Sequence, residues 1–228
     1  MKRTLLIAAT LATCLFTAPP HAAAQYLTGD RSAAIAGGAD PDFWDYQDAP
    51  RTHDRGLLLR ASFGPSFITT RSYVDQDTRL ILSGGALAGQ LTVGGIVAPD
   101  VAVHLSGSIQ LALSPAVYIG GEALEAESAG LKVWGIAPGL TLYLPNDVFF
   151  SPSFGVAILA VRFDEQELGQ PDPLLGFYVD ISAGKEWWIA DKFSTGVAAQ
   201  LTVHNAPSNL SAPFGGLSFG VNWTSTFN

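Results

Sequence analysis

The strongest constraint on the fold of this chain is a strict alternation of bulky apolar and small polar residues. It is clearest at residues 101–113, VAVHLSGSIQLAL, where the odd positions are Val, Leu, Ile or Gly and the even positions are Ala, His, Ser or Gln. Side chains alternate between the two faces of an extended strand, so this period of two predicts a β-strand whose faces meet different environments. Such segments recur from residue 57 onward. About eight of them, each of about ten residues, are expected, which is the length that a tilted strand needs to cross a bilayer.

The connections between these segments alternate in length. Tight turns are expected at 98–100, 145–147 and 190–191, and longer polar loops at 68–79, 114–130, 162–173 and 205–213. Short turns at one end and long loops at the other predict antiparallel hairpins in simple up-and-down order. Pro65, Pro138 and Pro152 fall within the expected strands. Because proline has no N–H to donate, we expect β-bulges or rim positions there.

The composition indicates which face is inside. Only 14% of the 228 residues are charged, whereas 48% are hydrophobic, and soluble domains carry about 25% charged residues. In a soluble sandwich or a secreted lipocalin-like binding barrel, the polar face would meet water and carry many charges. Here that face is mostly Gly, Ala, Ser and Thr, which suits the crowded interior of an eight-stranded barrel, and the bulky face suits lipid. We therefore expect the apolar face outside and keep the lipocalin-like barrel as the alternative fold.

Two other classes are disfavoured. No internal stretch of about 20 apolar residues is present, which excludes a bundle of transmembrane helices. The formal net charge is −8 without a long run of Lys or Arg, and this argues against nucleic acid as a partner.

Outward-facing aromatic residues gather at the two ends of the expected strands. Such rings are typical of membrane barrels, where they lie at the two lipid–water interfaces. The predicted aromatic girdle consists of Trp134 and Phe177 near the long loops and of Phe150, Trp187, Phe193, Trp223 and Phe227 near the short turns.

The N-terminus has the features of a signal peptide. Lys2 and Arg3 precede an apolar run, and Ala22–Ala24 provides a small-residue cleavage site. We predict a signal peptide at 1–24, an irregular periplasmic segment at 25–55 and the barrel at 56–228. The single cysteine, Cys14, lies in the signal peptide, so disulfides and thiol catalysis are not expected in the mature chain.

The signal peptide, the strand rhythm, the loop asymmetry and the terminal segment GGLSFGVNWTSTF resemble the small eight-stranded outer-membrane β-barrel family of Gram-negative bacteria, which includes the OmpA transmembrane domain, OmpX and OmpW. The resemblance implies an all-β, transmembrane, antiparallel up-and-down barrel with short periplasmic turns and long extracellular loops, located in the cell outer membrane. It also implies contact with outer-membrane lipid and lipopolysaccharide. In the last strand, Phe219, Val221, Trp223 and Phe227 keep the apolar phase that the barrel-assembly machinery recognises in this family. We expect a monomer.

Five charged residues are predicted to face the lumen as a polar network. Because buried charges must be paired or hydrogen-bonded, we expect them to pair across the barrel as a structural plug, and a gate or narrow conduit is the alternative. The five are Arg60, Lys132, Asp180, Glu186 and Lys192. His104 is expected to be a hydrogen-bonded interior residue.

The function that follows is a structural or surface-interaction role without catalysis. A narrow channel for small or apolar solutes is the alternative. A remote alternative is a lipid A-modifying enzyme similar to the lipid A deacylases, but the spacing from His204 to Ser208 is wrong for that family and no acid follows in the last strand. No catalytic residue, metal site or cofactor is expected.

Overall fold

The computed structural model describes residues 56–75, 77–124, 129–163, 173–207 and 213–227. The predicted signal peptide at 1–24 and the segment at 25–55 lie outside these residues. Among the described residues, no helix has the length and apolar character needed to cross a membrane.

The described chain is almost entirely β-strand, as the alternation predicts, with one short 3₁₀ helix, η3 (Pro145–Asp147). The strands in chain order are β1 (Gly56–Tyr73), β2 (Arg79–Ala98), β3 (Val101–Ala112), β4 (Ala116–Ile119), β5 (Glu122–Leu124), β6 (Ala129–Leu144), β7 (Val148–Phe163), β8 (Leu174–Ala190), β9 (Phe193–Ala206) and β10 (Phe214–Phe227).

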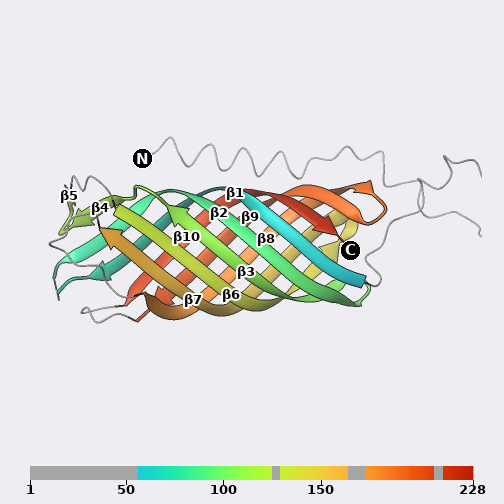
Figure 1. Cartoon of the computed structure of the whole chain (residues 1–228), viewed down its shortest axis with the longest axis horizontal. Coiled ribbons are helices and arrows are strands. Elements are labelled where there is room, and N and C mark those ends of the chain that lie inside the picture. The colour runs from blue at the N-terminus through green and yellow to red at the C-terminus, as the bar shows by residue number, and fades with distance from the viewer. Residues whose placement is uncertain (1–55, 76, 125–128, 164–172, 208–212, 228) are drawn as a thin grey trace, which may run out of the picture. The chain divides into compact units, whose positions relative to one another are not determined.

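Eight of these strands form a closed ring (Figure 1). Each of β1, β2, β3 and β6 to β10 pairs with the strand before and after it, and β1 closes the ring by pairing with both β2 and β10. All pairings are antiparallel. The predicted up-and-down eight-stranded barrel is therefore confirmed. The hairpin of β4 and β5 stands outside the ring and pairs with β2 beyond the end of β3.

The strands are longer than the ten residues expected, and the first long loop is correspondingly shorter. Residues 68–73, predicted as loop, continue β1 and pair with the first residues of β2, so the loop is confined to 74–78. The Asp75 carboxylate accepts hydrogen bonds from the backbone N–H groups of Asp77 and Thr78, at 3.0 and 2.7 Å, and so stabilises the turn.

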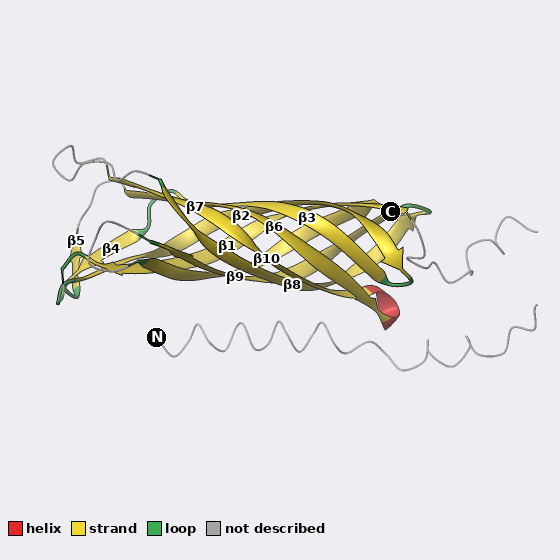
Figure 2. Cartoon of the chain, turned by 90° about the horizontal axis from the view of Figure 1, so that it is seen from below, coloured by secondary structure: helices red, strands yellow, loops and turns green. Residues whose placement is uncertain are grey.

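The two ends of the barrel differ, as predicted. The tight turns, η3 and the end of β10 lie at one end, which is the periplasmic end, and the β4–β5 hairpin lies at the other, extracellular end (Figure 2). Both register shifts in the ring, between Ile96 and Ala98 and between Trp188 and Ala190, are at the periplasmic turns.

The outer face of the ring is apolar. Phe63, Leu105 and Phe154 are 66%, 50% and 64% exposed, although a soluble barrel would bury such side chains. The alternative of a lipocalin-like barrel is therefore wrong. The outward residues of β3 from Val101 to Leu111 carry no charge. At a rise of about 3.3 Å per residue and a tilt of about 40°, they span roughly 25 Å, the height of the apolar band of a transmembrane barrel.

The three strand prolines do not cause the bulges or rim positions that the sequence led us to expect. On either side of Pro65 the pairing of β1 with β10 runs from Phe63–Trp223 to Ser66–Gly220, so the register is unchanged and two residue pairs are skipped. Pro138 and Pro152 lie at similar gaps between β6 and β7. Each proline still pairs with its other neighbouring strand. The missing N–H therefore interrupts one ladder locally without shifting it.

Candidate functional site in the barrel interior

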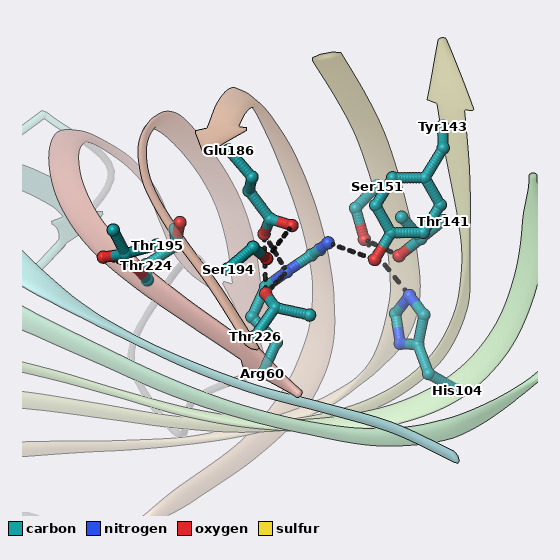
Figure 3. A network of polar contacts seen from close by, with 10 residues as sticks. All are labelled: Arg60, His104, Thr141, Tyr143, Ser151, Glu186, Ser194, Thr195, Thr224 and Thr226. Atoms are coloured by element: carbon teal, nitrogen blue, oxygen red, sulfur yellow. Dashed lines mark hydrogen bonds and ion pairs between the residues drawn. The ribbon is translucent and has the colours of Figure 1, made fainter. Parts of the chain in front are cut away.

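The inner face carries a charged cluster near the periplasmic end. The guanidinium of Arg60 in β1 and the carboxylate of Glu186 in β8 form an ion pair of 3.1 Å, and these residues are 2% and 1% exposed (Figure 3). Thr226 Oγ1 accepts a hydrogen bond from Arg60 Nε at 3.0 Å and donates one to Glu186 Oε1 at 2.6 Å. Ser194 Oγ donates to Glu186 Oε2 at 3.0 Å. Both buried charges are thus paired and hydrogen-bonded, which is the condition for retaining them inside a protein.

The same arginine reaches the opposite wall. Arg60 Nη2 donates to the Tyr143 hydroxyl of β6 at 2.9 Å, and Arg60 Cζ lies 3.9 Å from the ring centroid of Phe149 in β7. A cation over an aromatic face is attracted by the electron-rich ring, and the attraction is larger where water is excluded. Because β7 lies four strands from β1 in either direction round the ring, the Arg60–Phe149 contact crosses the full diameter of the barrel.

A smaller hydroxyl cluster lies beside the charged one. His104 Nε2 of β3 is 3.1 Å from Ser151 Oγ of β7, and Ser151 Oγ is 2.9 Å from Thr141 Oγ1 of β6 (Figure 3). Gly139 makes room for this cluster, since a Cβ at that position would lie 2.7 Å from His104 Cε1. His104 is the interior, hydrogen-bonded residue that the sequence predicts.

The middle of the lumen holds Asp180 of β8, which is fully buried. Its carboxylate accepts hydrogen bonds from Gln200 Nε2 at 2.6 Å, from Thr202 Oγ1 at 3.0 Å and from Gln90 Nε2 at 3.1 Å. The predicted pairing of Asp180 with a cation is not what stabilises it, because these three donors are neutral. Asn222 Nδ2 extends the cluster by donating to Gln200 Oε1 at 2.6 Å.

Two more contacts in this middle zone cross the barrel. Gln90 of β2 and Asp180 of β8 lie four strands apart, and so do Gln110 of β3 and Thr202 of β9, whose Nε2–Oγ1 distance is 2.9 Å. The crossings lie at successive levels. Arg60 is in register with Thr92. Gln90 lies two residues before Thr92 in β2, nearer the extracellular end, and Gln110 is in register with Ala88, two residues nearer still.

The extracellular half of the interior is apolar. Its large buried side chains come from β1, β2, β6, β7, β8 and β10 and include Tyr178, Ile68, Leu82, Leu131, Leu159 and Phe214. A polar pair, Thr70 Oγ1 with His204 Nε2 at 2.9 Å, is embedded among them. Polar crossings therefore fill the lower lumen, and a hydrophobic core fills the upper part.

Two of the five predicted lumen residues do not face the lumen. Lys132 is exposed on the outer face of β6, in phase with Trp134, and Lys192 is exposed in the tight turn between β8 and β9. The interpretation of both was wrong. Lys132 occupies an outward position of the alternation, and at Lys192 the alternation has ended because the chain turns. Arg60, Asp180 and Glu186 do face inward, but only Arg60 and Glu186 meet.

The residues of the predicted aromatic girdle all point outward. Their exposed fractions lie between 36% and 52%. In register, Phe193 pairs with Phe227 beside the periplasmic end, and Trp134 pairs with Ile109 and Ile158 in the extracellular half. The seven are Trp134, Phe150, Phe177, Trp187, Phe193, Trp223 and Phe227.

Sequence reasoning missed the neutral half of the lumen network. Gln90, Gln110, Gln200 and Asn222 carry no charge and were not singled out, although each occupies an inward position of its strand. Amide side chains at inward positions are the signal that could have found them. Among the residues that the structure describes, no three His, Cys, Asp or Glu side chains are grouped so as to hold a metal ion.

The comparisons with known proteins concern the fold alone. No protein family and no curated protein matches the sequence. The outer membrane protein OprG from Pseudomonas aeruginosa is 12% identical, with a TM-score of 0.46, over 77% of this chain and 98% of its own. Ail, the attachment invasion locus protein of Yersinia pestis, is 13% identical, with a TM-score of 0.41, over 73% of this chain and 98% of its own. The outer membrane protease OmpT from Escherichia coli is 9% identical, with a TM-score of 0.41, over 79% and 99%.

The fold follows from the chain's own features. A closed ring of eight antiparallel strands leaves no unpaired edge in the bilayer, and an uncharged apolar band surrounds a polar lower lumen. The chain is a small eight-stranded β-barrel of the outer-membrane type.

Proposed function

We propose that this protein is a structural or surface-interaction barrel of the outer membrane, with a permanently plugged lumen and without catalysis. The observation that carries the proposal is the set of three contacts across the full diameter, Arg60 to Phe149, Gln90 to Asp180 and Gln110 to Thr202. Side chains that meet across the barrel at three successive levels occupy the path that a solute would take. The apolar core above them adds a second obstruction, because ions lose their hydration there without a replacement.

The absence of catalysis is supported by where the candidate groups lie. His104 and His204 are 5% and 2% exposed, and each is hydrogen-bonded to a hydroxyl inside the barrel. A nucleophile and its base must be within reach of each other and of the substrate. Here each histidine is within reach of a hydroxyl, but both histidines are buried among the described residues, away from a substrate in the solvent or in the lipid. A role at the cell surface then depends on the extracellular loops and on the β4–β5 hairpin, since loops on a rigid scaffold usually carry recognition.

The deciding experiment is single-channel recording in planar bilayers. We expect the purified protein to insert without measurable conductance. Because both obstructions must be opened, the test variant removes one partner of each crossing and thins the apolar core, and it should conduct; its changes are Arg60→Ala, Gln90→Ala, Gln110→Ala, Leu82→Ala and Leu131→Ala. The matched control places five alanines on the outer face and should stay silent; its changes are Leu87→Ala, Leu91→Ala, Val93→Ala, Val103→Ala and Leu105→Ala.

Two results would favour the competing functions. Steady conductance of the unmodified protein that changes with Asp180→Asn would indicate a channel for small solutes. A change in the mass spectrum of lipid A on expression, absent with His104→Ala or with His204→Ala, would indicate a lipid A-modifying enzyme.

A further inference from the structure

Four basic side chains stand on the outer wall of the barrel at its extracellular end. Arg71 of β1, Arg79 of β2, Lys132 of β6 and Arg162 of β7 are all exposed. Each lies in the same alternation phase as the lipid-facing residues of its strand, for example Lys132 with Trp134. They therefore project away from the lumen, beyond the upper edge of the apolar band.

The four cations form two pairs on neighbouring strands. In β6 and β7, Lys132 is opposite Ala160 and Arg162 is opposite Gly130, so Lys132 and Arg162 are diagonal neighbours on one face. Arg71 and Arg79 have the same diagonal relation across β1 and β2. Diagonal positions of an antiparallel pair lie about 7–8 Å apart, within reach of long side chains. Two like charges at this spacing repel each other unless an anion lies between them.

That anion does not come from the described part of the barrel. No described carboxylate forms an ion pair with any of the four cations. Arg79 has a neutral partner, because its Nη2 donates to the Tyr73 hydroxyl at 3.3 Å and its Cζ lies 5.7 Å from the Tyr73 ring centroid. This contact holds the guanidinium against the outer face of the barrel, and no carboxylate of the described residues compensates its charge.

Along the barrel axis, the cations lie at the level of the lipid headgroups. Lys132 is two residues beyond Trp134, and Trp side chains mark the lipid–water interface. For a tilted strand, two residues correspond to roughly 5 Å along the barrel axis, which places the ammonium at headgroup level. The periplasmic end differs in charge, because its tight turns contain three carboxylates besides Lys192, namely Asp100, Asp147 and Asp191.

We propose that these two pairs are binding sites for the phosphate groups of lipid A in the outer leaflet. A guanidinium binds a phosphate through two parallel hydrogen bonds, and an ammonium adds a compact charge, so an Arg and a Lys at diagonal positions suit one phosphate between them. The flanking Trp134 and Ile158 would pack against the acyl chains of the same lipid. We name lipid A as the ligand because the two pairs lie at the extracellular end and this lipid forms the outer leaflet of a Gram-negative outer membrane.

The test compares charge-neutral variants in vesicles of defined composition. The site variant is Lys132→Gln with Arg162→Gln, and the matched control is Lys185→Gln with Lys192→Gln, which removes the same charge at the periplasmic end. The urea midpoint for unfolding is measured in phosphatidylethanolamine vesicles with and without lipid A. We expect lipid A to raise the midpoint of the unmodified protein and of the control. The site variant should lose about half of this increase, because the pair of Arg71 and Arg79 remains. By titration, the site variant should bind about half as much lipid A as the unmodified protein.

Further ligands and variants in the same urea assay identify what is bound. Dephosphorylated lipid A and free inorganic phosphate should produce no increase, and the charge-preserving variant Lys132→Arg with Arg162→Lys should restore it. All variants should have the same midpoint without lipid A, which excludes a folding defect. The proposal is wrong if the site variant keeps the increase, if the control loses it equally, or if phosphatidylglycerol vesicles produce the same increase as lipid A.

Discussion

Removing the charge of Glu186 should be one of the most destabilising conservative changes in this barrel. Glu186→Gln keeps the shape of the side chain and one acceptor oxygen, but it leaves the 2% exposed guanidinium of Arg60 without a counter-charge. Tyr143, Thr226, the Phe149 ring and the remaining acceptor oxygen at position 186 would then stabilise that cation without a counter-charge. Breaking a buried ion pair by removing one partner costs about 3–5 kcal/mol, and because these neutral partners remain we expect the lower end, about 3 kcal/mol.

A double-mutant cycle separates the pair from its surroundings. Arg60→Met removes the cation but keeps an unbranched apolar side chain, and the double variant Arg60→Met with Glu186→Gln buries no charge at this place. Because the two side chains are in contact, the double variant should be more stable than the sum of the single effects predicts, by about 2 kcal/mol.

The assay is equilibrium urea unfolding in phospholipid vesicles, followed by tryptophan fluorescence. Lys185→Gln, next to Glu186 in sequence but on the outer face, is the control and should change the free energy of unfolding by less than about 0.5 kcal/mol. The reasoning is refuted if Glu186→Gln costs no more than this control, or if the effects of the two single variants simply add.

Three further predictions concern the outer face of the barrel, two glycines of its strands and Asp75 in the first loop. Leu105→Arg, in the middle of the apolar band, should lower the free energy of unfolding by about 2–4 kcal/mol, whereas Val97→Arg at the periplasmic rim should cost about 0–1 kcal/mol in the same urea assay. Gly94→Ala should cost about 1–3 kcal/mol because its Cβ would overlap the neighbouring strand, whereas Gly107→Ala, which meets nothing within 4 Å, should be close to neutral. Two backbone N–H donors lower the pKa of Asp75 below its ordinary value of 3.8, so an NMR titration should find it ionised below that value. The contribution of Asp75 to stability is then complete above its unfolded pKa and is lost as the pH falls through the folded pKa. A measured pKa of 3.8 for Asp75 would contradict this prediction.

The sequence alone determined which eight segments form the ring, their order and the inward or outward direction of nearly every side chain, but not the full length of the strands. A period of two is a local property of extended backbone, and the loss of alternation at turns is equally local. For this reason the alternation is sufficient to assign Arg60, Asp180 and Glu186 to the inner face. The outward position of Lys132 was also readable, because it shares the phase of Trp134. At Lys192 the phase ends in a turn, and the alternation carries no information there.

Other features could be decided only by the closed ring. Whether Glu186 or Asp180 meets Arg60, and whether Gln110 touches Thr202 on the opposite wall, depends on the number of strands and on their stagger round the barrel. The alternation assigns each residue to a face but does not align one wall with the wall across from it. The division of the lumen into a polar lower part and an apolar upper part has the same origin. Each strand contributes only a few inward residues to each level, and closure brings these residues together into layers.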